Sequence, residues 1–126
     1  MTELATVSIE PSGRTIVAHL RGEVDLSNAR DLGARILEAV PNDACGLILD
    51  LAETRYLDSA GVRVVFDVAA RLRHRGQELA IAAAPGTPVR RILELTEVAQ
   101  VAKLHSDEAS AVASFSLNEI GLPDQN

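Results

Sequence analysis

The sequence predicts a single α/β domain in which about four helices pack on a mixed β-sheet. Alternating apolar and polar residues at 7–9 and 16–20 flank residues 11–14, whose proline, serine and glycine favour a turn, so a β-hairpin is expected. Beyond the hairpin, short apolar runs alternate with longer segments of helical spacing, which is typical of parallel strands joined by helices. The 126 residues suit one domain, which we place at residues 1–118, followed by a flexible tail at 119–126.

Each later element is predicted from the spacing of its apolar residues and from the residues at its ends. Strands are expected where apolar side chains occupy consecutive positions, namely at residues 47–51, 78–83 and 101–104. Helices are expected where apolar residues recur every three or four positions after a residue that can cap a helix. These helices begin near Ser27, Asp58 or Ser59, Thr87 and Ser106. Gly76 is expected to end the second helix, because glycine readily adopts the left-handed conformation found there.

The composition disfavours several classes of function. Apolar residues make up 47% of the chain and aromatic residues only 2%, so the core is expected to consist of valine, leucine, isoleucine and alanine. The net charge of −6, without a basic cluster that contains aromatics, disfavours binding to nucleic acid. No apolar run approaches the roughly 18 residues of a membrane span, and the N-terminus lacks the pattern of a signal peptide. Cys45 is the only cysteine, so no intramolecular disulfide is expected, and a cytoplasmic protein without membrane contact fits best.

The most informative stretch of the chain is residues 47–76. An apolar strand is followed by a polar loop, then by Asp58-Ser59-Ala60-Gly61, and then by a long helix. A serine at such a strand-to-helix junction lies where backbone N–H groups and the helix dipole favour negative charge. Ser59 is therefore interpreted as a capping residue, as a nucleophile, or as a hydroxyl that another protein modifies.

The interpretation of Ser59 as a nucleophile lacks a base. His74 lies near the far end of the helix that begins at Ser59, about 20 Å away at a rise of about 1.5 Å per residue, which is too far to activate the hydroxyl. The Gly-x-Ser-x-Gly elbow of serine hydrolases is also missing. His19 and His105 stand in unrelated elements, and no Cys/His pair has the spacing of a metal site. We therefore expect no enzymatic activity, no metal site and no cofactor.

Two acids are candidates to accompany Ser59. If the strand that leads into Asp25 lies beside the strand at 47–51, Asp25 and Asp58 project from the same sheet edge as Ser59. Taken alone, Asp58 is more simply a helix cap and Asp25 a loop residue.

The helix after Ser59 has an apolar face wider than one contact with a sheet requires. Beside the stripe that contains Val62 and Val65, a second stripe of Val64 and Val68 is offset around the helix. The helix is therefore either wedged between the sheet and another helix, or it exposes one edge to a protein partner. The sequence leaves both interpretations open.

Three motifs carry a resemblance to a known family. Residues 22–25, Gly-Glu-Val-Asp, resemble a Gly-Glu-Leu-Asp stretch that follows a second strand, and residues 47–51 resemble a central strand. Residues 58–62, Asp-Ser-Ala-Gly-Val, resemble an Asp-Ser-x-Gly-Leu motif that opens a key helix. In this order and spacing the chain resembles the STAS-domain family, and specifically its bacterial anti-sigma factor antagonists, over about residues 5–117. The resemblance implies a STAS-like α/β fold.

The resemblance also implies a function for Ser59. In the family, an anti-sigma factor that is a serine kinase phosphorylates the matching hydroxyl with ATP, and a serine phosphatase removes the phosphate. Only the unphosphorylated protein binds the anti-sigma factor and so releases a sigma factor for transcription. The chain itself is then expected to contact no nucleic acid, and a weak homodimer is compatible with this role. The resemblance places Asp58, Gly61 and Asp25 near the phosphorylation site, and Ala60, Val62 and Arg63 at the partner-binding surface.

Two other functions stay open from the sequence. A STAS scaffold or a small-ligand-binding module would act without phosphorylation, so its binding would not depend on Ser59. A small hydrolase would need a histidine or lysine within hydrogen-bond reach of Ser59.

Overall fold

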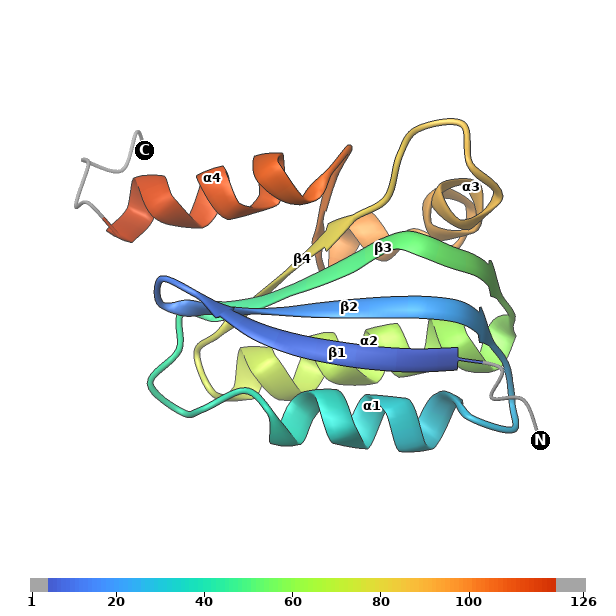
Figure 1. Ribbon diagram of the computed structural model, residues 1–126, viewed down its shortest axis with the longest axis horizontal. Coiled ribbons are helices and arrows are strands. Elements are labelled where there is room, and N and C mark those ends of the chain that lie inside the picture. Colours follow the sequence, from blue (N-terminus) through green and yellow to red (C-terminus); the bar gives the residue numbers. More distant parts are fainter. Residues whose placement is uncertain (1–4, 120–126) are drawn as a thin grey trace.

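The computed structural model describes residues 5–119 as five strands, four α-helices and one short 3₁₀ helix (Figure 1). The strands are β1 (Ala5–Ser12), β2 (Thr15–Val24), β3 (Gly46–Leu57), β4 (Glu78–Ala82) and β5 (Lys103–His105). The helices are α1 (Ala29–Glu38), α2 (Ser59–His74), α3 (Pro88–Leu95), the 3₁₀ helix η1 (Val98–Gln100) and α4 (Glu108–Glu119). Apart from η1, this order matches the prediction. Of the predicted tail, residue 119 still belongs to α4, and residues 120–126 lie outside the described residues.

The sheet is mixed, as predicted. Its strands lie in the order β1-β2-β3-β4-β5. The hairpin strands β1 and β2 are antiparallel, and each later neighbour pair is parallel. The hairpin turn contains Gly13, whose φ of 60° costs glycine little. Because β2, β3 and β4 run in the same direction, the loops at their carboxyl ends gather at one edge of the sheet.

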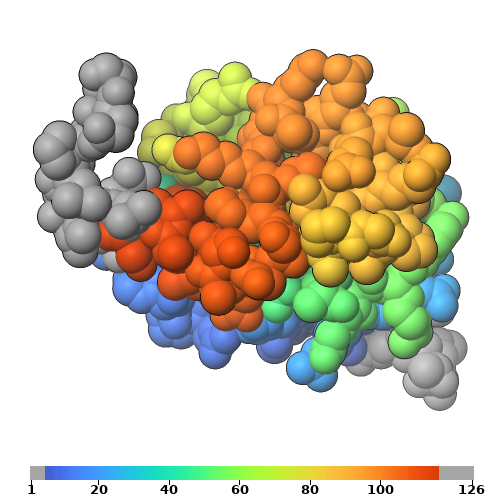
Figure 2. Space-filling model, turned by 90° about the horizontal axis from the view of Figure 1, so that it is seen from above, coloured from blue at the N-terminus to red at the C-terminus, as the bar shows by residue number. Residues whose placement is uncertain are grey.

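Helices cover both faces of the sheet. Helices α1 and α2 lie under one face, and α4 lies over the other (Figure 1). Seen from above, α4 (red-orange) lies over this second face, while the hairpin strands (blue) stay visible along one side (Figure 2). Helix α3 instead buries Val89 and Leu93 in the same core as α1 and α2. Because side chains alternate along a strand, the neighbours Leu47 and Ile48 belong to different cores. The core under α4 contains Val17, Ile48, Ala80, Ala111 and Phe115.

Strand β3 is longer than predicted. It continues past Leu51 to Leu57, where we expected a polar loop. Beyond Asp50 it pairs only with β2, so this end of the strand is more exposed and tolerates polar residues. Thr54 holds it in place, because this residue is buried and its hydroxyl donates a 2.6 Å hydrogen bond to the carbonyl of Leu20. This segment is therefore polar because it is an exposed end of a strand, and not because it is a loop.

Most helix ends follow the predicted residues. Thr87 caps α3, and Gly76 follows the end of α2 with a φ of 75°. The start of α1 is an exception, because Asn28 is the N-cap and Ser27 instead donates its hydroxyl to Asp25. Among the described residues, no helix is both long enough and apolar enough to cross a membrane.

Two glycines allow α2 to pack closely on its neighbours. A Cβ atom at Gly61 would lie 2.5 Å from Cδ1 of Leu57 and 3.2 Å from Cγ1 of Val24, so the first turn of α2 sits directly on the ends of β2 and β3. A Cβ atom at Gly33 of α1 would lie 2.6 Å from Cγ1 of Val64. The second apolar stripe of α2 therefore packs against α1. Of the two interpretations of the wide apolar face, the wedged helix is confirmed.

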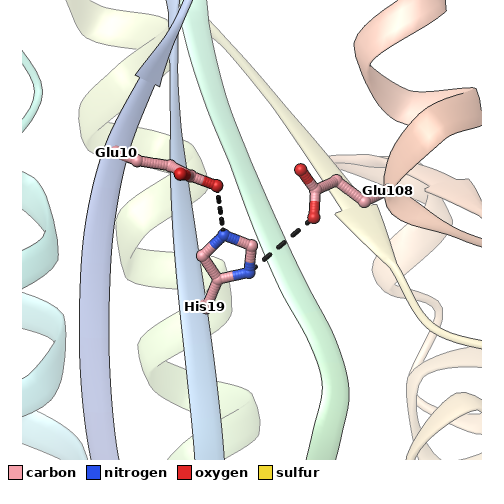
Figure 3. A group of neighbouring side chains, drawn as sticks. All are labelled: Glu10, His19 and Glu108. Carbon is pink, nitrogen blue, oxygen red and sulfur yellow. Dashed lines mark hydrogen bonds and ion pairs between the residues drawn. The ribbon is translucent and has the colours of Figure 1, made fainter.

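His19 joins several elements on the face of the sheet that carries α4. Its Nε2 lies 2.7 Å from Oε1 of Glu10 on β1, and its Nδ1 lies 2.8 Å from Oδ2 of Asp50 on β3. Glu108, in the first turn of α4, is 3.8 Å from the same Nδ1 (Figure 3). The hydrogen bond to Glu10 and the charge of Asp50 together raise the pKa of His19 above its ordinary value of 6.5, against the opposing effect of partial burial. The sequence alone gave no sign of this cluster.

We predict a pH dependence of stability that arises from His19. A group with a raised folded-state pKa stabilises the fold fully below its unfolded pKa and loses this contribution as the pH rises through its folded pKa. In chelator-treated buffer, the free energy of unfolding of the wild type minus that of His19→Asn should therefore be largest below about pH 6.5 and should fall at higher pH. Urea titrations from pH 5 to 9 measure this difference, and one that grows with pH would contradict the assignment.

We also predict that Gly61→Ala lowers the free energy of unfolding by about 1–3 kcal/mol, because both neighbouring side chains are fully buried and cannot move away. Gly33→Ala should cost less, since Val64 is only half-buried and alanine favours the helix. Urea denaturation of both variants measures the two effects. A Gly61→Ala protein as stable as the wild type would disprove the close packing of α2.

Candidate functional site

The candidate site lies where β2 and β3 end and α1 and α2 begin. Val24 and Leu57, the last residues of the two strands, are register partners. The backbone N–H of Asp58 donates a 3.1 Å hydrogen bond to the carbonyl of Val24. The loop from β2 to α1 and the start of α2 are thus fixed side by side at one edge of the sheet. The expectation that Asp25 and Asp58 lie at the same edge is confirmed.

Asp58 connects the two halves of the site. Its Oδ1 accepts a 3.0 Å hydrogen bond from the N–H of Gly61, which caps α2. Its Oδ2 accepts a 3.3 Å hydrogen bond from the N–H of Leu26 in the loop after β2. The carboxylate therefore both begins the helix and holds the neighbouring loop against it.

Ser59 is the first residue of α2, and its side chain is exposed. The interpretation of Ser59 as the helix cap is wrong, because Asp58 fills that role. Within residues 5–119, no hydrogen bond engages the hydroxyl of Ser59 with a histidine, a lysine or any other group. His74 is the last residue of the same helix, 16 residues long. The described structure therefore places no general base at Ser59, and it leaves the hydroxyl accessible to another protein.

Asp25 organises the loop that faces Ser59. Its Oδ1 accepts hydrogen bonds from the backbone N–H and the hydroxyl of Ser27, at 2.9 and 2.5 Å. Asn28 completes the loop, because its side-chain amide donates to the carbonyl of Glu23 and its Oδ1 accepts from the N–H of Asp25, both at 3.0 Å. Asp25 is thus a structural residue of the site. Sequence reasoning missed Asn28, although asparagine is among the preferred N-cap residues.

The remaining candidates differ in their access to solvent. Ala60 is half-buried and Arg63 is exposed one helical turn after Ser59, on the same side of α2. Val62, in contrast, is only 8% exposed and belongs to the core. Val62 therefore supports the surface from beneath, and the accessible part of the predicted partner surface consists of Ala60 and Arg63, next to the exposed Ser59.

Two exposed apolar residues beside this surface were missed by the sequence analysis. Leu26 has 83% of its surface exposed, and Tyr56 has 49%. Leu26 is held by the hydrogen bond from its N–H to Asp58, and Tyr56 lies two residues before Asp58. Single exposed apolar side chains are common on protein surfaces, and Leu26 and Tyr56 are candidate contact residues because of their place beside Asp58. The sequence signal is weak, because a single leucine between polar residues does not stand out.

The chain is similar in sequence to known proteins. The family model described as "Mlab, STAS domain" matches residues 7–105. BtrV of Bordetella bronchiseptica, named as an anti-sigma factor antagonist, is 31% identical over 100 residues, which cover 79% of this chain and 85% of BtrV.

Solved structures show the same fold. The crystal structure of an anti-sigma factor antagonist from Mycobacterium paratuberculosis is 22% identical, with a TM-score of 0.77 over 87% of this chain and 92% of that one. The anti-sigma factor antagonist SpoIIAA in its unphosphorylated form is 18% identical, with a TM-score of 0.67 over 93% of this chain and 100% of that one. The predicted fold class is confirmed. The chain belongs to the STAS-domain family.

Proposed function

We propose that this protein is an anti-sigma factor antagonist that binds its anti-sigma factor while Ser59 is unmodified and releases it when Ser59 is phosphorylated. One observation carries the proposal: Ser59 is exposed at the start of α2, next to a carboxylate that already caps the helix. Its hydroxyl is therefore not needed for the fold, and a modification there leaves the structural hydrogen bonds of Asp58 in place.

The chemistry required of this chain is that of a substrate. The anti-sigma factor, acting as a serine kinase, would transfer the γ-phosphoryl group of ATP to Oγ of Ser59. An O–P bond forms, ADP leaves, and the hydroxyl proton passes to a base of the kinase. Since the described structure offers no base at Ser59, the protein itself has no catalytic role in this step. A serine phosphatase would restore the hydroxyl.

A phosphate at Ser59 is compatible with the fold but changes the charge of the surface around Ser59. It adds a charge of about −1.5 to −2 at pH 7. The first turn of α2 tolerates this charge, because the helix N-terminus carries partial positive charge, and Arg63 lies one turn away as a cation. Asp58, however, places a second negative charge beside the phosphate. A partner surface that matches the unmodified hydroxyl then meets two adjacent anions.

The apolar residues at the site support binding to a protein. Leu26, whose N–H is hydrogen-bonded to Asp58, and Tyr56, two residues before Asp58 at the end of β3, both offer exposed apolar area. A preformed apolar contact next to a switchable hydroxyl is well suited to a partner that is bound in one state and released in the other.

The relatives support the same proposal. BtrV is named as an anti-sigma factor antagonist, and SpoIIAA has been solved in unphosphorylated and phosphorylated forms. We therefore place this protein in the cytoplasm, as a regulator of sigma-factor-dependent transcription that works through an anti-sigma factor and contacts no nucleic acid itself.

The first test is the site of phosphorylation. Incubation with the cognate anti-sigma kinase and ATP should add one phosphate, which peptide mass spectrometry should locate on Ser59. Ser59→Ala should abolish its incorporation, whereas Ser8→Ala, which alters an exposed serine of β1, should leave it unchanged. A phosphate on another residue would overturn the proposed switch. Binding to the kinase that does not depend on Ser59 would instead favour a scaffold that acts without phosphorylation.

The second test concerns the apolar contact. Leu26→Ala should weaken binding of the unphosphorylated protein to the anti-sigma factor about tenfold, which corresponds to about 1.4 kcal/mol. Leu95→Ala is the matched control, because Leu95 is also a leucine with 70% of its surface exposed but belongs to α3. Isothermal titration calorimetry measures both affinities. Equal effects of the two substitutions would show that the loop after β2 is not the contact surface.

A further inference from the structure

We propose that Glu10, His19 and Glu108 form a binding site for one divalent transition-metal ion, of which Zn²⁺ is the best match. The three side chains come from β1, β2 and α4 and converge on the face of the sheet opposite α2 (Figure 3). Their candidate ligand atoms all lie within 4.8 Å of one another. These residues have no metal-ligand spacing in the sequence, because the fold brings them together from distant parts of the chain.

Asp50 supplies an independent reason to interpret the cluster as a metal site. A histidine that binds a metal through one ring nitrogen commonly donates the N–H of the other to a carboxylate. Oδ2 of Asp50 lies 2.8 Å from Nδ1 of His19, and Oδ1 of Asp50 accepts a 3.1 Å hydrogen bond from the N–H of Ala52. Only 12% of the Asp50 side chain is exposed. Asp50 is therefore a fixed acceptor that orients the ring and leaves Nε2, beside Glu10, as the metal ligand. Glu108, whose Oε1 lies 3.8 Å from Nδ1, reaches a metal on Nε2 by rotation of its partly exposed side chain.

The donor set favours Zn²⁺ over Mg²⁺ or Ca²⁺. One imidazole nitrogen and two carboxylate oxygens match a zinc site with three protein ligands and a fourth position for water, whereas Mg²⁺ and Ca²⁺ prefer oxygen alone. With metal–ligand bonds of about 2.0–2.2 Å, tetrahedral ligands lie about 3.4 Å apart. Glu10 and Glu108 are 57% and 38% exposed, so their side chains are free to close to this separation.

The charges around His19 also favour a cation. Carboxylates from three elements face the ring: Glu10 on β1, Asp50 on β3 and Glu108 on α4. Arg21 on β2, which lines the same cavity as His19, is paired with Glu53 at 2.7 Å. His19, Asp50 and Glu53 also line a cavity of about 100 Å³.

The bound metal would tie α4 to the hairpin. In the described residues, α4 otherwise packs on the sheet mainly through the small core of Ala111 and Phe115. The site is separate from Ser59, because Asp50 precedes Leu57 by seven residues of strand, about 23 Å. Metal binding is therefore expected to stabilise the attachment of α4 without altering the phosphorylation site.

Isothermal titration of ZnCl₂ into the chelator-stripped full chain tests the proposal. We expect one site, and about a hundredfold or greater loss of affinity in His19→Gln. Glu108→Gln should lose about tenfold or more, and Asp50→Asn, which changes only the orienting acceptor, about 10–100-fold. His74→Gln, Cys45→Ser and Glu38→Gln are matched controls outside the cluster, and each should bind Zn²⁺ as the wild type does.

Three results would overturn the site: no Zn²⁺ binding by the wild type, binding that survives both His19→Gln and Glu108→Gln, or binding lost in a control variant. Circular dichroism checks that each variant is folded. If His19→Gln does not fold, Glu108→Gln decides, because this side chain is partly exposed at a helix start. Co²⁺ provides a second measurement: strong visible absorption bands are expected from tetrahedral coordination in the wild type, and their persistence in Glu108→Gln would also contradict the site.

Discussion

The functional end of this protein depends on one carboxylate. Asp58 accepts the N–H of Gly61 through one oxygen and the N–H of Leu26 through the other. The first bond starts α2, and the second fixes the loop that leaves β2. Replacing Asp58 with a residue that cannot accept both bonds would separate the helix from the loop. The aspartate that begins the family motif therefore has a structural role. Because Asp58 caps the helix, the hydroxyl of Ser59 is not needed as a cap and stays exposed.

Close packing around this carboxylate explains how a single phosphate can act locally. Gly61 lets α2 rest on Leu57 and Val24, and Asp25 with Asn28 holds the opposing loop through several hydrogen bonds. A rigid support of this kind does not move when charge is added at its surface. Under the proposed function, the added charge would therefore change what the surface binds and not how the protein folds. A tenfold change in affinity requires only about 1.4 kcal/mol, which is well within the reach of a phosphate beside an apolar contact.

Local patterns predicted much of the fold, and tertiary contacts account for what they missed. The hairpin, the parallel strands and the cap at Thr87 follow from alternation, apolar runs and capping preference. The length of β3 did not follow, because residues 53–55 are polar and only the buried Thr54 and the pairing with β2 make this segment a strand.

The candidate site, too, was predicted only in part from the sequence. Ser59, Asp58 and Asp25 were expected at one edge, and the parallel pairing of β2 with β3 brings them there. The sequence did not distinguish the cap from the first helical residue, because aspartate and serine are about equally good N-caps. Leu26 and the cluster around His19 were missed, since exposure and the convergence of β1, β2, β3 and α4 are properties of the folded chain.

The central claim is that phosphorylation of Ser59 blocks the binding surface without changing the fold. The most direct measurement is the dissociation constant of the anti-sigma factor for the unmodified protein and for the same protein quantitatively phosphorylated on Ser59, with circular dichroism of both forms. The account predicts at least about tenfold weaker binding by the phosphorylated form and unchanged spectra. Equal affinities, or weaker binding accompanied by loss of structure, would contradict it.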